Sequence, residues 1–292
     1  MSKIKNFSNR SGYIWLDGKF VRWNKAKIHV LSHGLHYASC VFEGARIYNG
    51  KIFKLNEHTK RLFLSSKTLG FKLPFSEGQI NIACKQIIKK QGVKNGYLRP
   101  FAWRGSEMMA ISAQNTTIHV AIATWEMTTY FDINKKFNGI KLLTSEWMRP
   151  PSNTAPTQAK AAGLYMICTL SKHIAEKRGY DDSLMLDSKG YVAESTGANI
   201  FFVKGKKLYT PIADCFLNGI TRQTVIDLAK KNNIGVVEKK VLPKELLKAD
   251  EIFLTGTAVE ITPISQIDNK KFKVGEVTRK LISLFNNLVE NN

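Results

Sequence analysis

The order of apolar and polar residues divides the first half of the chain into short strands, tight turns and helices. Two pairs of extended runs flank Asp17-Gly18 and Asn49-Gly50, dipeptides that are typical of two-residue hairpin turns. These runs cover 13–16 with 20–23 and 40–48 with 51–54, and further extended runs cover 28–31, 96–103 and 117–125.

Helical periodicity occurs in two longer segments of the same half. Asn56 is placed to cap a helix that stops at Gly70, because asparagine accepts first-turn amides and glycine ends helices. Ser76 opens a second helix that ends at Gly92, and 32–38 is expected to form one helical turn. Strands followed by helices indicate an α+β fold class.

The apolar pattern breaks over 126–137 and resumes with further strands and helices. Strands are predicted at 140–143, 183–186, 190–193, 199–203, 207–209, 236–241 and 251–254, and helices at 164–178, 221–232 and after Gly275. We therefore expect an N-terminal α+β domain over 1–125, an interdomain linker over 126–137 and a C-terminal domain over 138–292.

Composition narrows the class of protein. A chain of 292 residues with 43% hydrophobic residues is typical of a globular protein with one large or two medium domains. No apolar run is long enough to cross a membrane and the first residues lack a signal-peptide core, so a cytoplasmic protein is expected. The four cysteines contain no C-x-x-C pair, which indicates reduced and mostly buried thiols without a metal.

The formal net charge of +21 is unusual and raises the possibility of a nucleic-acid or membrane-surface partner. The lysines, however, are spread through every segment, and no basic block reaches five residues. We therefore expect a solvated basic surface, with no nucleic-acid and no membrane partner, and keep a basic nucleic-acid-binding protein as a distant alternative.

Lys160 lies in an unusual local sequence. A proline-rich polar loop precedes it, and small residues from Ala159 to Gly163 surround it before an apolar helix begins. A lysine with so little bulk around it can approach a flat group, and a desolvated lysine is the usual nucleophile toward carbonyl cofactors. The alternative at this point is a solvated surface lysine.

Three other sequences could support such a lysine. Gly219, followed by Ile220 and Thr221, opens a helix whose first amides suit a phosphate. Thr257 lies in a turn of small and hydroxyl residues that can offer amides to an anion. Glu194 precedes an apolar strand and could face a cationic heteroatom. A Schiff-base lysine, two anion-binding turns and an acid are what pyridoxal phosphate requires.

Longer motifs occur in order along nearly the whole chain. The run from Glu194 through Asn199-Ile200-Phe201 and Thr210 to Leu217-x-Gly219-Ile220-x-Arg222 resembles the signature of class IV, fold-type IV pyridoxal-phosphate aminotransferases. The motifs that resemble branched-chain amino acid aminotransferase are Ser32-His33-Gly34-Leu35-His36-Tyr37, Val41-Phe42-Glu43-Gly44-Ala45-Arg46-x-Tyr48, Asn56-Glu57-His58-x-x-Arg61-Leu62, Tyr97-x-Arg99-Pro100 and Gly256-Thr257-Ala258-x-Glu260-Ile261-Thr262-Pro263.

The resemblance implies a two-domain fold: a smaller N-terminal α/β domain, a larger C-terminal domain with a β-barrel-like core, and pyridoxal 5′-phosphate at the domain interface. It assigns Lys160 to the Schiff base and to proton transfer, and Glu194 to the ring nitrogen. It assigns Tyr165 to the ring hydroxyl oxygen. The residues that it assigns to the phosphate are Arg61, Gly219, Ile220, Thr221 and Thr257.

The resemblance also implies how substrates bind. Tyr97 and Arg99 alternate on one strand face, so both can point toward the same space. With Thr257 and Ala258 they would receive substrate carboxylates. The apolar wall would consist of Phe42, Gly44, Trp125 and Tyr37, the last from the neighbouring subunit. A homodimer is therefore expected as the minimum unit, with a hexamer as the larger alternative.

The chain departs from the family pattern after Trp125, where the position of Tyr130 is shifted, and in the loop Gly105–Ala110. The expected reaction is transamination between leucine, isoleucine or valine and 2-oxoglutarate. Two reactions on the same fold remain as alternatives: D-amino acid aminotransferase and aminodeoxychorismate lyase.

Overall fold

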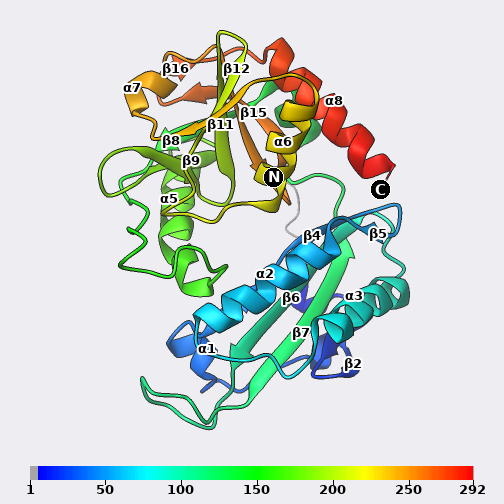
Figure 1. The fold of residues 1–292 in the computed structure, drawn as a ribbon. Helices are drawn as coiled ribbons and strands as arrows, with labels where there is room; N and C mark the ends of the chain where they lie inside the picture. The colour runs from blue at the N-terminus through cyan, green and yellow to red at the C-terminus, as the bar shows by residue number, and fades with distance from the viewer. Residues whose placement is uncertain (1–5, 292) are drawn as a thin grey trace. The chain divides into compact units, whose positions relative to one another are not determined.

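The computed structural model describes residues 6–291 and divides the chain into two compact units (Figure 1). The N-terminal unit extends to Thr128 and also contains Ala159–Gly163, whereas the C-terminal unit comprises Thr129–Gln158 and the residues from Leu164 onward. These limits differ from the predicted domain boundaries mainly at 159–163. This short segment packs with the N-terminal unit because it pairs there with a strand.

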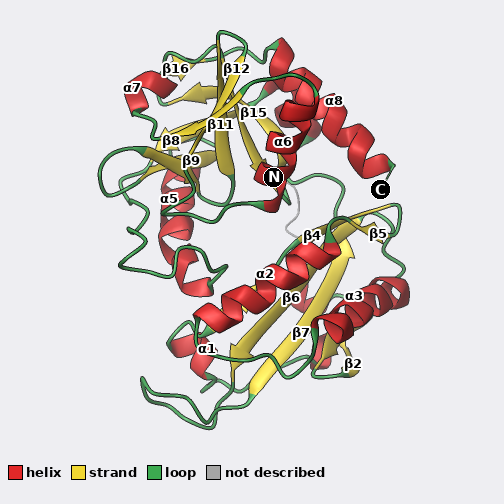
Figure 2. Cartoon of the chain, in the orientation of Figure 1, coloured by secondary structure: helices red, strands yellow, loops and turns green. Residues whose placement is uncertain are grey.

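The N-terminal unit is an antiparallel sheet with two helices on one face (Figure 2). Its strands follow the order β2-β1-β7-β6-β4-β5, and β3 also pairs with β6. The strands are β1 (Tyr13–Leu16), β2 (Lys19–Arg22), β3 (Cys40–Phe42), β4 (Ala45–Tyr48), β5 (Lys51–Ile52), β6 (Gly96–Arg104) and β7 (Ile118–Glu126). The helices are η1 (Phe7–Asn9), η2 (Trp23–Lys25), α1 (His33–His36), α2 (Leu55–Thr68) and α3 (Glu77–Gln91).

The predicted hairpins and helices of this unit are largely confirmed. Ser76 caps α3 with a reciprocal capping box to Gln79, which satisfies two amides at the helix start. The prediction that Asn56 caps α2 is wrong, because Lys54 takes that position and Asn56 accepts instead from the Asn81 side-chain amide. The run 28–31 forms no strand.

The predicted strand over 40–48 is interrupted at Glu43 and Gly44, which separate β3 from β4. The Glu43 amide donates to the Pro100 carbonyl at 2.7 Å, so the chain stays beside β6 across the break. A Cβ on Gly44 would overlap the Tyr97 hydroxyl group, and glycine is therefore required at this close approach. The interruption places the Glu43 side chain in the interior, where it is fully buried.

The C-terminal unit contains a closed ring of strands in the order β10-β9-β8-β15-β14-β11, in which β11 pairs back with β10. The strands of the unit are β8 (Ile140–Thr144), β9 (Asp182–Leu186), β10 (Val192–Ser195), β11 (Asn199–Lys204), β12 (Lys207–Pro211), β13 (Val236–Lys239), β14 (Glu251–Gly256), β15 (Glu260–Ile267) and β16 (Lys270–Lys271). This ring confirms the barrel-like core that the family resemblance implies.

Helices complete the C-terminal unit. They are α4 (Ile133–Asn138), η3 (Ala162–Tyr165, whose first two residues belong to the N-terminal unit), α5 (Met166–Lys177), α6 (Ile220–Lys231), α7 (Pro243–Leu246) and α8 (Glu276–Glu290). Strand β15 was not predicted, because Pro263 argues against a strand that pairs on both sides. Helix α4 was not predicted either, and all of it except Asn138 lies within the expected linker. No helix in residues 6–291 is long and apolar enough to span a membrane.

Candidate active site

Lys160 is held by its backbone within the N-terminal unit. Its N–H donates to Ser65 Oγ on α2 at 2.9 Å, and its carbonyl accepts the Phe42 N–H at 3.1 Å. The next residue, Ala161, forms an antiparallel bridge with Val41 of β3. The lysine Nζ lies 5.0 Å from the centre of the Phe42 ring. The small residues beside Lys160 therefore let this segment lie against a strand and a helix at once.

Phe42 belongs to a group of aromatic and cationic side chains on one face of the N-terminal sheet. Tyr97 and Trp125 are cross-strand partners on β6 and β7, with ring centres 5.3 Å apart. The Arg99 guanidinium lies 4.7 Å from the Phe42 ring and 5.4 Å from the Tyr97 ring. The structure thus brings together most of the predicted substrate wall around Lys160 within this unit.

Tyr37 lies outside that group in the single chain. It follows α1, is 45% exposed and stacks on His33 with ring centres 4.6 Å apart. Tyr130, in the C-terminal unit, is also exposed and packs edge-on against Phe131. The predicted role of Tyr37 depends on a second subunit and remains a prediction.

Arg61 lies on the face of α2 that also carries His58 and Ser65, since residues three and four apart share a helix face. Its Nε donates to Glu43 Oε1 at 2.6 Å and its Nη2 to Glu43 Oε2 at 2.9 Å. Arg61, the predicted phosphate ligand, is therefore held by two hydrogen bonds to the buried carboxylate of Glu43. Glu43 belongs to one of the family motifs but had no predicted role.

In the C-terminal unit, Glu194 is buried at the end of β10 beside two groups that had no predicted role. Arg149 Nε lies 3.5 Å from Glu194 Oε1, and Asn199 Nδ2 donates to Glu194 Oε2 at 3.1 Å. Burial works to lower the pKa of Arg149, but Glu194 and smaller contributions from neighbouring groups together outweigh it and raise that pKa above its usual value. Glu194 therefore has a permanently cationic neighbour.

Asn199 also connects Glu194 with the start of α6. Its Nδ2 donates to the Leu217 carbonyl at 3.0 Å, and its Oδ1 accepts the Gly219 N–H at 3.2 Å. Gly219 is the N-cap of α6 and has no side chain to cap the amides of Ile220 and Thr221. A Cβ at Gly219 would overlap Asn199 Oδ1, so the contact demands glycine.

The turn with Thr257 and Ala258 joins β14 to β15 near the same asparagine. Asn199 pairs with Thr255 across β11 and β14, and a Cβ added to Gly256 would lie 3.3 Å from the Ala198 Cβ. Tyr165 ends η3 within this unit, and its negative form would raise the pKa of Arg149. The predicted acid and anion-binding turns thus converge on the region around Asn199.

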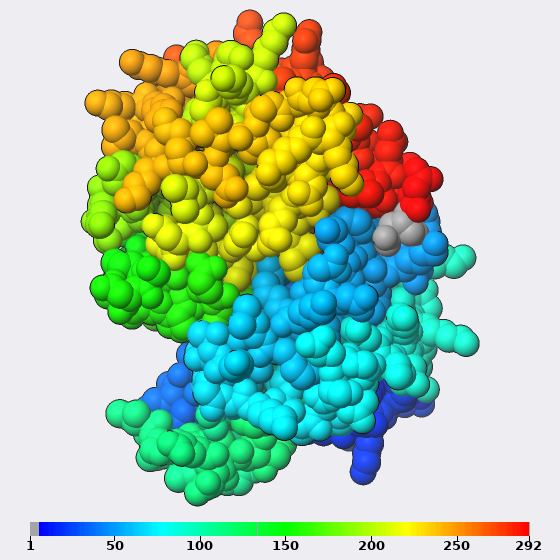
Figure 3. All heavy atoms as spheres, viewed as in Figure 1, coloured from blue at the N-terminus to red at the C-terminus, as the bar shows by residue number. Residues whose placement is uncertain are grey.

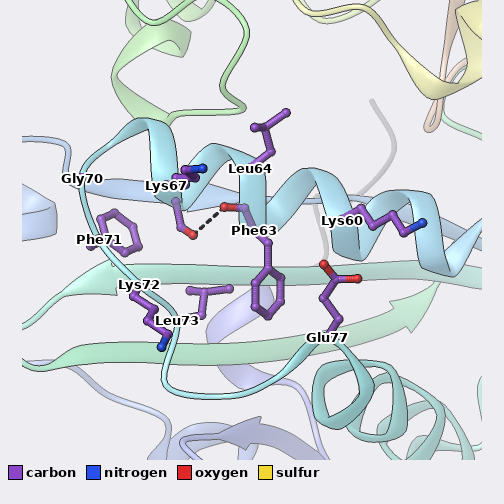
Figure 4. Close-up of a pocket in the computed structure, with 10 residues that line it drawn as sticks. Lys60, Phe63, Leu64, Lys67, Gly70, Phe71, Lys72, Leu73 and Glu77 are labelled. Carbon is purple, nitrogen blue, oxygen red and sulfur yellow. Dashed lines mark hydrogen bonds between the residues drawn. The ribbon is translucent and has the colours of Figure 1, made fainter.

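A separate groove of about 630 Å³ lies on the other side of α2 (Figure 4). Phe63 points toward the sheet and Leu64 points away from it, while Lys60 and Lys67 lie along the rim (Figure 4). None of the residues that line the groove is a predicted site residue. Figure 3 shows the surface of α2 and α3 in light blue to cyan. Leu64 of α2 is 55% exposed.

The residues that sequence reasoning left without a role are Glu43, His58, Arg149 and Asn199. Each is polar and nearly completely buried. Glu43, Arg149 and Asn199 each contact a predicted site residue, and His58 contacts Glu43. Three of them occur in the motifs quoted above, and Arg149 occurs in the polar loop before Lys160. Their contacts depend on the fold, so their residue type alone could not assign them.

Comparison with known proteins shows which family the chain is similar to. Residues 40–267 match the family described as amino-transferase class IV. A probable branched-chain-amino-acid aminotransferase of Rickettsia felis is 44% identical over 262 residues, which cover 89% of each chain. The branched-chain-amino-acid aminotransferase of Pseudomonas aeruginosa is 40% identical over 291 residues, covering 97% of this chain and 95% of its own.

Solved structures extend the likeness to the fold. The branched-chain amino acid aminotransferase of Escherichia coli is similar with a TM-score of 0.94 and 36% identity, covering 97% of this chain and 96% of that one. Another branched-chain amino acid aminotransferase, solved with pyridoxamine 5′-phosphate, gives a TM-score of 0.93 at 37% identity, covering 97% of this chain and 95% of that one. The chain belongs to the class IV amino-transferase family.

Proposed function

We propose that this protein is a pyridoxal-phosphate-dependent transaminase that exchanges amino groups between leucine, isoleucine or valine and 2-oxoglutarate. Family membership and the names of the relatives support the reaction class. The observation that carries the proposal is Lys160. Its backbone is hydrogen-bonded through both its N–H and its carbonyl, so its side chain starts from a fixed position beside the Phe42 ring, which the Arg99 guanidinium also approaches. A fixed lysine beside apolar rings suits a carbonyl cofactor.

The residues present fit this cofactor. Glu194 is a buried carboxylate of the kind that raises the pKa of a heterocyclic nitrogen. The start of α6 is open to an anion because Gly219 cannot cap it and can carry no Cβ. The bound cofactor would supply an electron sink for the carbon that loses a proton.

Each side chain then has a defined task. Lys160 Nζ would hold the cofactor and would also carry the proton that the substrate Cα loses. Glu194 keeps the ring nitrogen protonated. Tyr165 hydrogen-bonds the ring hydroxyl oxygen. Arg61, Thr257 and the amides of α6 bind the phosphate.

The substrate range follows from the wall on the N-terminal sheet. Phe42, Tyr97 and Trp125 give an apolar surface for a branched side chain, and Arg99 lies against two of these rings. An arginine at the edge of an apolar wall can accept the second carboxylate of glutamate. This combination favours branched-chain transamination over the D-amino acid aminotransferase and lyase alternatives.

A half-reaction screen tests the proposal directly. We expect the purified protein to be yellow and its visible band to be converted by leucine, isoleucine, valine and glutamate. D-alanine and aminodeoxychorismate should leave the band unchanged. Conversion by D-alanine alone would select the other aminotransferase, and a colourless protein that binds no added cofactor would reject the enzyme.

A homodimer is part of the proposal. Apolar side chains around Tyr37 are exposed in the single chain, among them Val30 at 73% and Leu35 at 61%. Ile111 in the neighbouring loop is 88% exposed, and His33 Nε2 is hydrogen-bonded to the Ala110 carbonyl at 2.9 Å, which ties the loop to α1. Exposed apolar groups of this kind mark interfaces. Sedimentation of the wild type and of Val30→Asp tests it, since the variant should shift toward monomer.

The cytoplasm is the proposed location. The four cysteines are free thiols, and three of them are buried, as expected for a reducing compartment. Fractionation of cells that express the full chain checks this, with recovery in the cytoplasmic fraction as the expected result.

A further inference from the structure

Glu43 is the centre of a buried cluster that the proposed chemistry does not use. The carboxylate accepts four hydrogen bonds: two from Arg61, one from His58 Nδ1 at 2.7 Å and one from the Gly44 N–H at 3.2 Å. Its side chain is 1% exposed, and that of His58 is 4% exposed. The Arg61 side chain, at 13%, is the member that extends toward accessible space.

The chain forces these groups together. The break between β3 and β4 directs Glu43 inward, and the spacing of three residues puts His58 and Arg61 on the α2 face that meets it. Ser65, one turn after Arg61, holds the Lys160 N–H on the same face. One helix face therefore fixes both the predicted phosphate ligand and the backbone of the predicted catalytic lysine.

The charge state of the cluster is well defined. Burial works to raise the pKa of Glu43, but the Arg61 charge and the hydrogen bonds from His58 and Arg61 hold it far below its usual range. Burial lowers the pKa of His58, and the positive charges of Arg61 and Lys160 add to that effect. At neutral pH the cluster is an ionised Glu43 bonded to a charged Arg61 and a neutral His58.

The fork between Glu43 and Arg61 defines the plane of the guanidinium. An arginine has five N–H donors, and Glu43 takes one from Nε and one from Nη2, which leaves the donors on the remaining edges of the plane directed elsewhere. A flexible arginine would lose rotamer freedom on binding a phosphate. An arginine that is already clamped has lost that freedom before the ligand arrives.

We propose that Glu43 is a positioning residue that clamps Arg61, so that the guanidinium is preorganised for the phosphate of the cofactor. His58 is the second anchor, a neutral donor that holds the carboxylate in register with α2. This inference rests on the proposed function, because it requires Arg61 to contact a phosphate.

The test compares a cofactor with and without its phosphate. The dissociation constants of pyridoxal 5′-phosphate and of phosphate-free pyridoxal are measured by absorbance on the full chain after removal of cofactor. We expect Glu43→Gln to raise the dissociation constant of pyridoxal 5′-phosphate by about 10- to 100-fold, which is the range for lost charge-assisted hydrogen bonds. The dissociation constant of pyridoxal should change by less than ~3-fold. Glu43→Asp, which keeps the charge, should recover part of the loss and serves if Glu43→Gln does not fold.

Glu251 provides a matched control. It is a buried carboxylate in the C-terminal unit that accepts from the Thr278 N–H at 2.7 Å and from Thr278 Oγ1 at 2.6 Å. Glu251→Gln should lower the melting temperature without changing the ratio of the two dissociation constants. A change in that ratio in Glu43→Gln alone separates positioning of Arg61 from loss of stability.

A double variant gives the decisive result. Arg61→Lys keeps the positive charge but removes the two-point contact with Glu43. If Glu43 acts through Arg61, adding Glu43→Gln to Arg61→Lys should lower the affinity for pyridoxal 5′-phosphate by less than ~3-fold. An equal loss of affinity for both cofactors, or the full loss in the Arg61→Lys background, would overturn the inference. Wild-type protein that binds neither cofactor would instead reject the proposed function.

Discussion

Each unit contains a buried carboxylate beside an arginine, and the two pairs are built differently. Glu43 and Arg61 form a two-point contact at 2.6 and 2.9 Å, and His58 adds a third donor. Glu194 lies 3.5 Å from Arg149, and its other carboxylate oxygen accepts from the neutral amide of Asn199. A forked contact fixes an orientation, whereas a longer contact mainly supplies electrostatic potential.

The difference in contact geometry indicates different roles for the two carboxylates. In the N-terminal unit the carboxylate holds another side chain in place. In the C-terminal unit the carboxylate is itself the group proposed to meet the ligand, and Arg149 places a positive charge beside it. The following experiments test this division, from the largest expected effect to the smallest.

The largest contrast is between Lys160 and Glu194. Lys160→Ala should abolish the visible band of the bound cofactor and lower the half-reaction rate by at least ~10³-fold, because the covalent anchor and the base are both lost. Glu194→Gln should keep a band, although shifted, and lower the rate on the order of 10²-fold. Absorbance and single-turnover kinetics measure both. Lys67→Ala, on the opposite face of α2, is the control and should leave band and rate unchanged.

The link between Glu194 and α6 can be broken at a glycine. Gly219→Ala places a methyl group against Asn199 Oδ1, and such overlap costs about 1–3 kcal/mol. We expect cofactor affinity to fall by about 10- to 100-fold. Gly197→Ala is the matched control, because no heavy atom lies within 4 Å of its added Cβ. Equal losses of cofactor affinity in both variants would show that the overlap with Asn199 is not the cause.

The Glu43 cluster should make the protein sensitive to acid. The folded pKa of His58 is lowered, so below its ordinary value of 6.5 the unfolded chain takes up a proton that folded His58 does not. The contribution of His58 to the free energy of unfolding is therefore fully present above pH 6.5. It is lost as the pH falls below that value, by up to ~1.4 kcal/mol per pH unit. Glu43, whose folded pKa is also lowered, acts in the same direction below its ordinary value of 4.5.

Urea unfolding between pH 8 and pH 5 measures this effect. His58→Gln cannot be protonated in this range, so its stability should change less with pH than that of the wild type. Burial raises the pKa of Asp182, so this residue makes the free energy of unfolding change with pH in the opposite direction. Because the wild type and His58→Gln both contain Asp182, comparing their curves removes its contribution. Parallel curves would contradict the assigned state of His58.

A separate effect, on thiol reactivity and not on cofactor binding or stability, concerns the cysteines of the two units. Burial raises the pKa of Cys40 and of Cys168 to about 11, although a neighbouring arginine opposes it in each case. Burial also raises the pKa of Cys84 and Cys215 to about 12. Because the thiolate is the reactive form, a rise from 9.0 to about 11 should slow modification at neutral pH by about 100-fold. A thiol reagent should therefore label four cysteines quickly only in denaturant. Rapid labelling of one cysteine in the native protein would show that its thiol is not shielded in this way.

Sequence patterns predicted the elements whose causes are local. The hairpin at Asp17-Gly18 and the helix that begins after Ser76 depend on residues a few positions apart, and both form as predicted. The cap at Asn56 was wrong because Asn81, 25 positions away, binds that side chain. The strand with Pro263 was missed because its pairing partners β14 and β8 are defined by tertiary pairing, which the local pattern around a proline does not reveal.

The same distinction applies to the candidate site. Residue type and order were enough to propose Lys160, Glu194 and the turns at Gly219 and Thr257 as candidates, because they match the motifs of a known family. The tertiary structure was needed to show that Arg61 donates hydrogen bonds to Glu43, 18 positions away in the sequence. It was also needed to show that Asn199 is hydrogen-bonded to both Glu194 and Gly219. Hydrogen bonds of a few ångströms depend on where separate strands and helices meet, and the pattern of one segment does not contain that information.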